Sequence, residues 1–386
     1  MTGASDPTPD QPTAAPAEAA GSAEASTRTA PARPGAARRW VRAGVQFVGF
    51  AGGLALLAWC GAQAFSDENR AQLERLREAS ALVVGGLFAL SALSLLLNGL
   101  IFWATIAPVR RVRLSSVLAT NALATFLAYL PMKLSVAARV LLHNKRDGVP
   151  VLQIGGWFTA VGATMAATLL PLGAVSYLFR AVNVPWAATL TVVLAVSIAV
   201  TYFGARILRT DAALARGRRF LLALRLRLCE RLTHTEHFEH FRSGLSMLAH
   251  PWGLLAASGL RLADVAAQAG RFLLAAAAVG AVLPADDAIL VASVYFLIGV
   301  FSPAGTLGVR EGGAALAAGA LGVSSASAFA TVALVVGAAE AITNLAAAGC
   351  AVAWLRPDRM LRARAREGAG EGEGEVAEWQ SGEVAE

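Results

Sequence analysis

Long apolar runs constrain this chain more than any other feature of its sequence. Several runs of about 20 residues or more lie between residues 43 and 355. Such runs are typical of membrane-spanning helices, because lipid offers no hydrogen bonds and a helix satisfies its backbone internally. With 56% hydrophobic and 15% charged residues, the chain also has little charge for covering a soluble surface. We therefore expect an all-α, polytopic membrane bundle.

Basic residues flank these runs and predict the topology. Loops rich in Lys and Arg remain in the cytoplasm, so the net charge of +7 indicates membrane topology and not nucleic-acid binding. The segments before the first run and after the last are both basic, which predicts that both termini are cytoplasmic. Six full spans follow from this pattern, at residues 43–65, 80–107, 151–179, 184–208, 250–283 and 325–355.

Two further apolar segments do not fit as full spans. Residues 114–130 lie between two basic clusters, and a full span there would put one cluster outside. Pro131 marks a point where a helix could break and return to the same side. Residues 288–322 must start and finish outside by the same argument, and they are interrupted from Pro303 onward. Both segments are predicted to be broken, re-entrant hairpins.

The order of these elements repeats along the chain. Each half reads span, span, broken hairpin, span, and the two hairpins enter from opposite sides. This order is typical of an inverted-topology repeat, in which broken helices meet near the midplane of the membrane.

Three polar segments flank or interrupt the predicted transmembrane domain at 43–356. Residues 1–42 are rich in Ala, Pro, Thr and Ser and predict a disordered cytoplasmic tail. Residues 210–245 form a basic cytoplasmic loop, which contains either an amphipathic helix on an anionic leaflet or a solvated linker. Residues 357–386 turn from basic to acidic and predict a second disordered cytoplasmic tail.

No metal, other cofactor or catalytic site is expected. His234, His237 and His240 recur every third residue, but such steps drift around a helix, and a solvated loop explains them better than a metal site. The three cysteines lack the spacing of a zinc site or a disulfide framework. Paired carboxylates or a nucleophile–base spacing are missing as well, so we do not expect an enzyme.

The second break carries the sharpest candidate binding site. Pro303, Gly305 and Gly308 interrupt the helix, and Arg310 and Glu311 follow at membrane depth. Charges there cost about 2.5–3.5 kcal/mol each, so they usually face a cavity or one another. A helix that starts after Gly308 would point free N–H groups at an anion such as a phosphate. The alternative is a kinked helix whose Arg and Glu merely pair.

The first break offers weaker candidates. Asn121 precedes Pro131, and Lys133 and Arg139 follow it. The two cations could attract an anionic head group, or they could be ordinary flanking residues on the cytoplasmic side.

Charged and polar residues inside other spans are further candidates. Arg261 and Asp264 are three residues apart, so they share a helix face and could form an intramembrane ion pair, either structural or in a substrate path. Arg271 lies further along the same helix. Glu340 and Asn344 are four apart in the last span and either line a cavity or join helices.

The stretch Pro-x-Gly-x-x-Gly-Val-Arg-Glu-Gly from Pro303 to Gly312 resembles the C-terminal motif of the lysylphosphatidylglycerol synthase transmembrane region family. The stretch from Asn121 through Pro131 and Lys133 to Arg139 is similar to its N-terminal motif. The resemblance covers about residues 45–355. It implies a flippase-like protein of the bacterial inner membrane that binds and translocates a lipid with an anionic or modified head group.

The resemblance brings forward Pro303, Gly305, Gly308, Arg310 and Glu311 as site residues, and Lys133 and Arg139 as weaker ones. Two departures matter. Bifunctional members carry a soluble aminoacyl-transferase domain after the membrane part, whereas here a polar tail follows, so we expect no synthesis of lysylphosphatidylglycerol. Members also often carry an Arg and an Asp in the helix after the first motif, whereas residues 155–164 carry no charge.

Two other classes of function remain open from the sequence. One is an ion-coupled transporter of a small solute, with Glu311 or Asp264 as the proton carrier. The other is a non-transporting scaffold in envelope assembly. The sequence predicts no particular protein partner for either.

Overall fold

The computed structural model describes residues 36–131, 133–210, 246–302 and 305–356, with a few isolated positions between 211 and 245. The predictions for most of the two tails, for the basic loop, for the three histidines and for Pro303 lie outside the described residues. Two units separate along the chain, residues 1–42 and 43–386. The contacts considered below all belong to the second unit.

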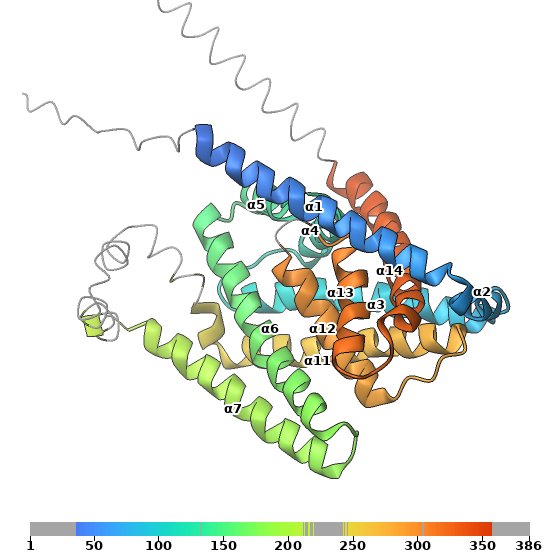
Figure 1. Cartoon of the computed structure of the whole chain (residues 1–386). Coiled ribbons are helices and arrows are strands. Elements are labelled where there is room, and N and C mark those ends of the chain that lie inside the picture. The colour runs from blue at the N-terminus through green and yellow to red at the C-terminus, as the bar shows by residue number, and fades with distance from the viewer. Residues whose placement is uncertain are drawn as a thin grey trace, which may run out of the picture. The chain divides into compact units, whose positions relative to one another are not determined.

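Every secondary-structure element in the described part of the chain is helical, as predicted (Figure 1). The elements are, in chain order, α1 (Ala36–Ala64), η1 (Asp67–Asn69), α2 (Arg70–Arg77), α3 (Ala81–Ile106), α4 (Leu114–Leu127), α5 (Leu134–Asp147), α6 (Val151–Phe179), α7 (Val184–Leu208), η2 (Ser246–Ala249), α11 (Pro251–Ala278), α12 (Ala285–Phe301), α13 (Val309–Ala320) and α14 (Ala326–Leu355). The largest buried apolar cluster joins α3, α6, α7 and α11 to α14.

Among the described residues, five helices are long and apolar enough to cross a membrane: Gly44–Ala64 of α1, α3, α6, Val184–Ile207 of α7, and α14. The predicted span at 250–283 corresponds to α11, whose 28 residues extend about 42 Å. Its hydropathy is lowered by Arg261, Asp264, Gln268 and Arg271, and each of these side chains is at most 1% exposed. The polar face of α11 is therefore turned into protein, where charges at membrane depth usually lie.

Two boundaries differ from the sequence prediction. The first helix begins at Ala36, before the expected start at residue 43, because Ala36, Ala37, Arg38 and Arg39 are good helix formers that extend the span. Residues 66–78, expected as a loop, fold into η1 and α2.

The two broken segments are helical hairpins, as expected from the charge pattern. Ser116 near the start of α4 donates a hydrogen bond to Asp147 at the end of α5, at 2.9 Å. Arg180 pairs with Asp287 at the start of α12, at 3.1 Å, and also donates to the carbonyl of Leu321 just after α13. Each hairpin therefore returns to the end of the bundle where it begins.

Contacts between loops agree with the sides predicted for them. Arg75 donates to the carbonyl of Gly280 at 3.1 Å. Arg75 follows the first predicted span, and Gly280 lies near the end of the predicted span 250–283 that was expected to face outside. Arg110 donates to the carbonyl of Gly148 at 2.9 Å, and both lie in segments expected inside. Segments assigned to one side by their charge thus meet at one end of the bundle.

Helix packing follows the predicted repeat. We match each helix of the first half with one of the second: α3 with α11, α4 with α12, α5 with α13 and α6 with α14. Two helices that are in contact then correspond to two other helices that are also in contact. The pair α4–α14 becomes α12–α6, α3–α4 becomes α11–α12, and α5–α6 becomes α13–α14. The pair α3–α11 maps onto itself, and these two helices run side by side in Figure 1. An inverted repeat accounts for this exchange.

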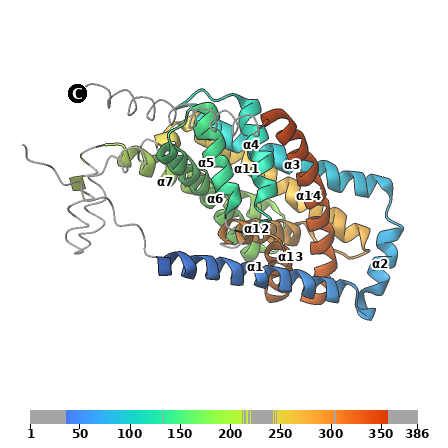
Figure 2. The same cartoon turned by 90° about the horizontal axis from the view of Figure 1, so that it is seen from above.

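The tips of the two hairpins meet each other. The backbone N–H of Thr306 donates to the carbonyl of Ala128 at 3.0 Å, and the Thr306 hydroxyl donates to the same carbonyl at 3.2 Å. Helix α1 covers the second tip, and Figure 2 shows it running beside α12 and α13. A Cβ atom on Gly53 would lie 2.7 Å from the carbonyl oxygen of Leu307. The tips are thus enclosed by protein.

This close approach predicts different effects for two neighbouring glycines of α1. Gly53→Ala should destabilise the protein by about 1–3 kcal/mol through overpacking against Leu307 and Val309. Gly52→Ala should be neutral or stabilising, because nothing lies within 4 Å of its Cβ position and alanine favours helix. Thermal unfolding of the two variants in detergent measures the difference. Equal midpoints would contradict the packing of α1 on the second tip.

Candidate functional site

A cavity of about 210 Å³ lies where the two hairpin tips meet. Helices α3, α4, α5, α11, α12, α13 and α14 all contribute to its wall. Its polar and charged lining residues are Ser91, Ser94, Asn98, Thr125, Ser135, Arg139, Gln268, Arg271, Thr306, Arg310, Glu340 and Asn344. Three arginines and one glutamate give the lining a formal charge of 3 − 1 = +2. The cavity is therefore suited to an anion.

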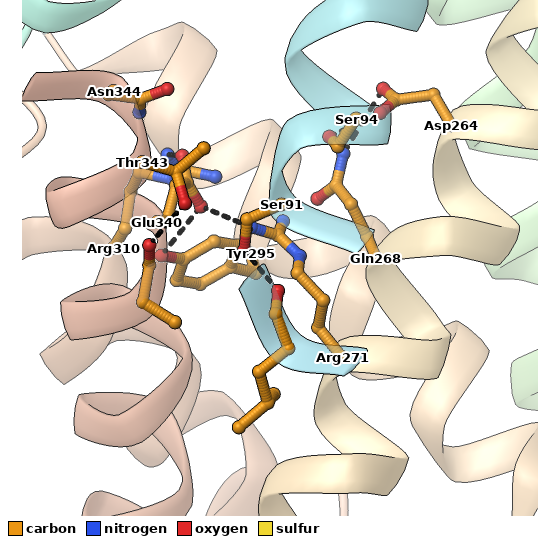
Figure 3. A network of polar contacts seen from close by, with 12 residues as sticks. Ser91, Ser94, Asp264, Gln268, Arg271, Tyr295, Arg310, Glu340, Thr343 and Asn344 are labelled. Atoms are coloured by element: carbon orange, nitrogen blue, oxygen red, sulfur yellow. Dashed lines mark hydrogen bonds and ion pairs between the residues drawn. The ribbon is translucent and has the colours of Figure 1, made fainter. Parts of the chain in front are cut away.

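Glu340 on α14 is the centre of the charged network (Figure 3). Arg310 donates to one of its carboxylate oxygens at 2.5 Å, and Arg271 donates to the other at 3.0 Å. The Tyr295 hydroxyl also donates to Glu340 at 3.4 Å, and its ring lies 4.0 Å from the Arg310 guanidinium. Both carboxylate oxygens are thus satisfied by cations from α11 and α13.

Glu311 has a different role from the one expected. Its carboxylate accepts a hydrogen bond from the backbone N–H of Gly308 at 2.8 Å and lies 3.5 Å from the Tyr295 hydroxyl. Helix α13 does begin after Gly308, but its own Glu311 occupies the favourable position for an anion at the helix N-terminus. The sequence predicted that the N–H groups at the start of α13 would be free to bind an anion, and this prediction is wrong for the Gly308 N–H. Arg310 pairs with Glu340 and not with its neighbour.

Arg139 on α5 is held by neutral groups. Its guanidinium donates to the side-chain oxygen of Asn121 at 2.7 Å and lies 4.2 Å from the centre of the Phe102 ring. Asn121 in turn donates to the carbonyl of Leu95 at 3.1 Å, so it orients Arg139 and does not line the cavity itself. Among the described residues, no carboxylate forms an ion pair with Arg139, and one of its terminal nitrogens has no partner.

Two of the remaining predicted residues of the breaks lie at a neighbouring cavity of about 450 Å³. Lys133 and Gly305 line it, and it shares Ala128, Ser135 and Thr306 with the first cavity. Lys133 is exposed. The two cavities are thus neighbours, one lined by the three arginines and the other by an exposed lysine.

Two glycines fit the close contact of the tips. Gly305 has φ +115°, and a Cβ there would lie 3.3 Å from the carbonyls of Tyr129 and Leu130. Gly308 has φ +75°, and a Cβ there would collide with the carbonyl of Gly53. Both are positions where only glycine avoids strain. They shape the second tip and contribute no charge.

Arg261 and Asp264 form the ion pair that their spacing suggests, with an N···O distance of 2.6 Å, and both side chains are fully buried. Asp264 also accepts from Ser94 at 2.5 Å and from Gln268 at 3.1 Å. Figure 3 shows Ser94, Asp264 and Gln268 beside the Glu340 network. Because Ser94 and Gln268 line the cavity and the ion pair does not, Arg261 and Asp264 support the wall from behind.

The sequence did not single out every residue of the cavity lining and of the charged network. Arg271 was noted only as a further charge on its helix, and Tyr295 was not considered. A signal for α3 was available, since Ser91, Ser94 and Asn98 are spaced by three and four residues in an otherwise apolar helix. No local pattern marks Tyr295, because its partners lie on α13 and α14.

These features define a helical, multi-pass membrane protein in which two broken hairpins meet around a cationic cavity. The family model described as Lysylphosphatidylglycerol synthase TM region matches residues 46–348. The chain belongs to this family. No curated protein and no solved structure was found to match it. The family places the protein among membrane proteins connected with lipids.

The central position of Glu340 predicts its effect on stability. Glu340→Gln should destabilise the protein by about 3–5 kcal/mol, because it leaves Arg271 and Arg310 buried without a counter-charge. The matched control is Glu74→Gln, which removes the exposed pair with Arg70 and should cost about 1 kcal/mol or less. Denaturant unfolding in detergent compares the two. A Glu340→Gln variant as stable as the control would show that the network contributes little.

Proposed function

We propose that this protein binds a lipid with an anionic or modified head group and translocates it across the membrane. The observation that supports this most directly is the cavity between the hairpin tips, with three arginines and one glutamate in its lining. Guanidinium groups bind phosphate with paired hydrogen bonds. Membership of a lipid-related family favours a lipid as the carrier of that phosphate. The acyl or prenyl chains would stay in the bilayer.

The network offers a phosphate several donors at once. Arg271 and Arg310 each give one terminal nitrogen to Glu340, and each guanidinium has five N–H donors in all. Arg139 has a terminal nitrogen with no partner in the described structure. A phosphate can therefore share these cations with Glu340 and need not displace it completely. Such sharing would make binding reversible, as transport requires.

Movement of the head group requires the tips to part. Among the described residues of the tips, the direct hydrogen bonds between them are the two from Thr306 to the Ala128 carbonyl, each worth about 0.5–1.5 kcal/mol net. The neighbouring cavity at Lys133 and Gly305 shares the wall that contains these two residues. Parting the tips would join the two cavities into one path for a head group.

The location of the protein follows from the same sequence features. We propose that it resides in the inner membrane of a bacterium with both termini in the cytoplasm, because the basic residues before the predicted span at 43–65 and after α14 favour that side. We also propose that it acts without a catalytic step, since its polar cavity groups are ones that bind and release an anion.

Loss of the charged residues at the second tip should abolish lipid movement. In vesicles that contain the purified full-length chain, the Arg310→Ala, Glu311→Ala double variant should move fluorescent phosphatidylglycerol no faster than protein-free vesicles. The control is Arg70→Ala, Glu74→Ala, which removes an exposed pair of the same composition on α2 and should keep the wild-type rate. Equal rates in the wild type and in the first double variant would refute the proposed site.

The paired state of the carboxylates predicts that movement does not need a proton gradient. Asp264 pairs with Arg261, and Glu311 accepts a backbone N–H, so neither of the two proton carriers suggested by the sequence is free. Collapse of an imposed proton gradient with a protonophore should leave the rate of lipid movement unchanged within about twofold, a difference of less than about 0.5 kcal/mol. A strict requirement for the gradient would favour the ion-coupled transporter instead.

A further inference from the structure

We infer that the cavity selects lipid head groups by their net charge, accepting a phosphate without an ammonium group and rejecting aminoacylated head groups, and that Arg139 sets this preference. The inference rests on the proposed function and specifies its substrate class. It concerns the formal charge of the head group and not the identity of the lipid chains.

An ammonium group in the cavity would be stabilised best by an unpaired carboxylate in the lining. Among the described residues, the one carboxylate of the lining is Glu340, which is held by Arg271 and Arg310 at 3.0 and 2.5 Å. Glu311, which accepts the Gly308 N–H, and Asp264, which is paired with Arg261 at 2.6 Å, do not line the cavity. Within the described part of the chain, no carboxylate at the cavity is left to receive a second cation. An aminoacylated head group would therefore bring a positive charge into an already positive site.

The cavity has unused donors in the places where a phosphate would need them. One terminal nitrogen of Arg139 and the Nε atoms of Arg271 and Arg310 are buried and have no hydrogen-bond partner in the described structure. All three residues line the cavity, and the Arg271 side chain is only 1% exposed. Buried donors without a partner are unfavourable, and anionic oxygens satisfy them better than neutral ones.

Helix α6 adds no compensating charge. Its sequence from Val151 to Phe179 contains no acidic or basic residue, and it contributes Met165 to the lining. The cavity volume of about 210 Å³ is below the range of about 300–1,000 Å³ that is usual for pockets of drug-sized ligands. A compact phosphate group suits this space better than a phosphate extended by an amino acid.

Arg139 is the cation that sets the charge excess. Arg271 and Arg310 share the charge of Glu340, whereas Arg139 is held by the amide of Asn121 and the ring of Phe102. A bound anion would therefore neutralise the charge of Arg139 more fully than the charges of Arg271 and Arg310, which Glu340 already neutralises in part. A change at this position alters the net charge of the cavity and leaves the Glu340 network in place.

The test compares two lipids that differ by one lysyl ester. Vesicles with the purified full-length chain receive either fluorescent phosphatidylglycerol or fluorescent lysylphosphatidylglycerol with the same acyl chains. The wild type should move phosphatidylglycerol at least about tenfold faster. Arg139→Glu should abolish or reverse that preference, and Arg139→Gln should reduce it. Arg77→Glu, an exposed charge reversal on α2, is the control and should keep the preference.

High salt distinguishes selection in the cavity from attraction of anionic lipids to the protein surface. The chain has a net charge of +7, and exposed charges are screened at high ionic strength. The preference should persist at about 0.5 M salt. A helical circular dichroism spectrum and a monodisperse elution profile establish that each variant is folded. If Arg139→Glu does not fold, the rates of Arg139→Gln are used to test the role of Arg139.

Three results would overturn these conclusions in different ways. Equal wild-type rates for both lipids would refute the charge selection and leave lipid translocation standing. A wild-type preference that both Arg139 variants retain in full would refute the role of Arg139. Movement of neither lipid by the wild type would refute the proposed function itself.

Discussion

Backbone groups at a helix break have no water to bind inside a membrane, so protein must satisfy them. In this chain the two breaks satisfy each other. The carbonyl of Ala128 at the first tip accepts two hydrogen bonds from Thr306 at the second. The N–H of Gly308, directly before α13, is taken by Glu311. This requirement brings segments from the two halves of the chain to one point and encloses that point with helices.

The charge of the cavity follows from the same break. Because α13 begins at Val309, Arg310 lies in its first turn, where the positive end of the helix dipole disfavours a cation. A buried arginine there needs a strong counter-charge, and Glu340 on α14 provides it at 2.5 Å. The second carboxylate oxygen of Glu340 then holds Arg271 on α11. One carboxylate thus joins three helices and leaves two guanidinium groups with donors to spare.

The sequence predicts the parts of this arrangement that depend on near neighbours along the chain. Apolar length and flanking charge were sufficient for the helices of the spans and of the two hairpins, although α11 is not among the five described helices that are apolar enough to cross a membrane. The Arg261–Asp264 pair was visible because three residues place both side chains on one helix face. The cap of α13 was visible in principle as well, since Glu311 stands three residues after Gly308. The sequence left open whether Arg310 and Glu311 face a cavity or pair with each other.

Pairings across the bundle could not be predicted in this way. Glu340 is 30 residues from Arg310 and 69 from Arg271, and Arg139 is 18 from Asn121. Which of these partners meet depends on how the hairpins pack, and a single sequence contains no periodic signal for that. Tyr295 illustrates the point, because its hydroxyl is explained only by Glu311 and Glu340 on other helices.

The two halves of the repeat have matching helices, but the arginines that they contribute to the cavity have different partners. Helices α5 and α13 are counterparts in the two halves, and each contributes one arginine to the cavity. Arg139 on α5 is held by an amide and an aromatic ring, whereas Arg310 on α13 is held by a carboxylate. Under the proposed function, an anion bound at Arg310 would compete with Glu340, and an anion bound at Arg139 would meet no such competitor. A symmetric scaffold by itself would treat the two arginines alike, so their unequal partners are a source of different affinity in the two halves.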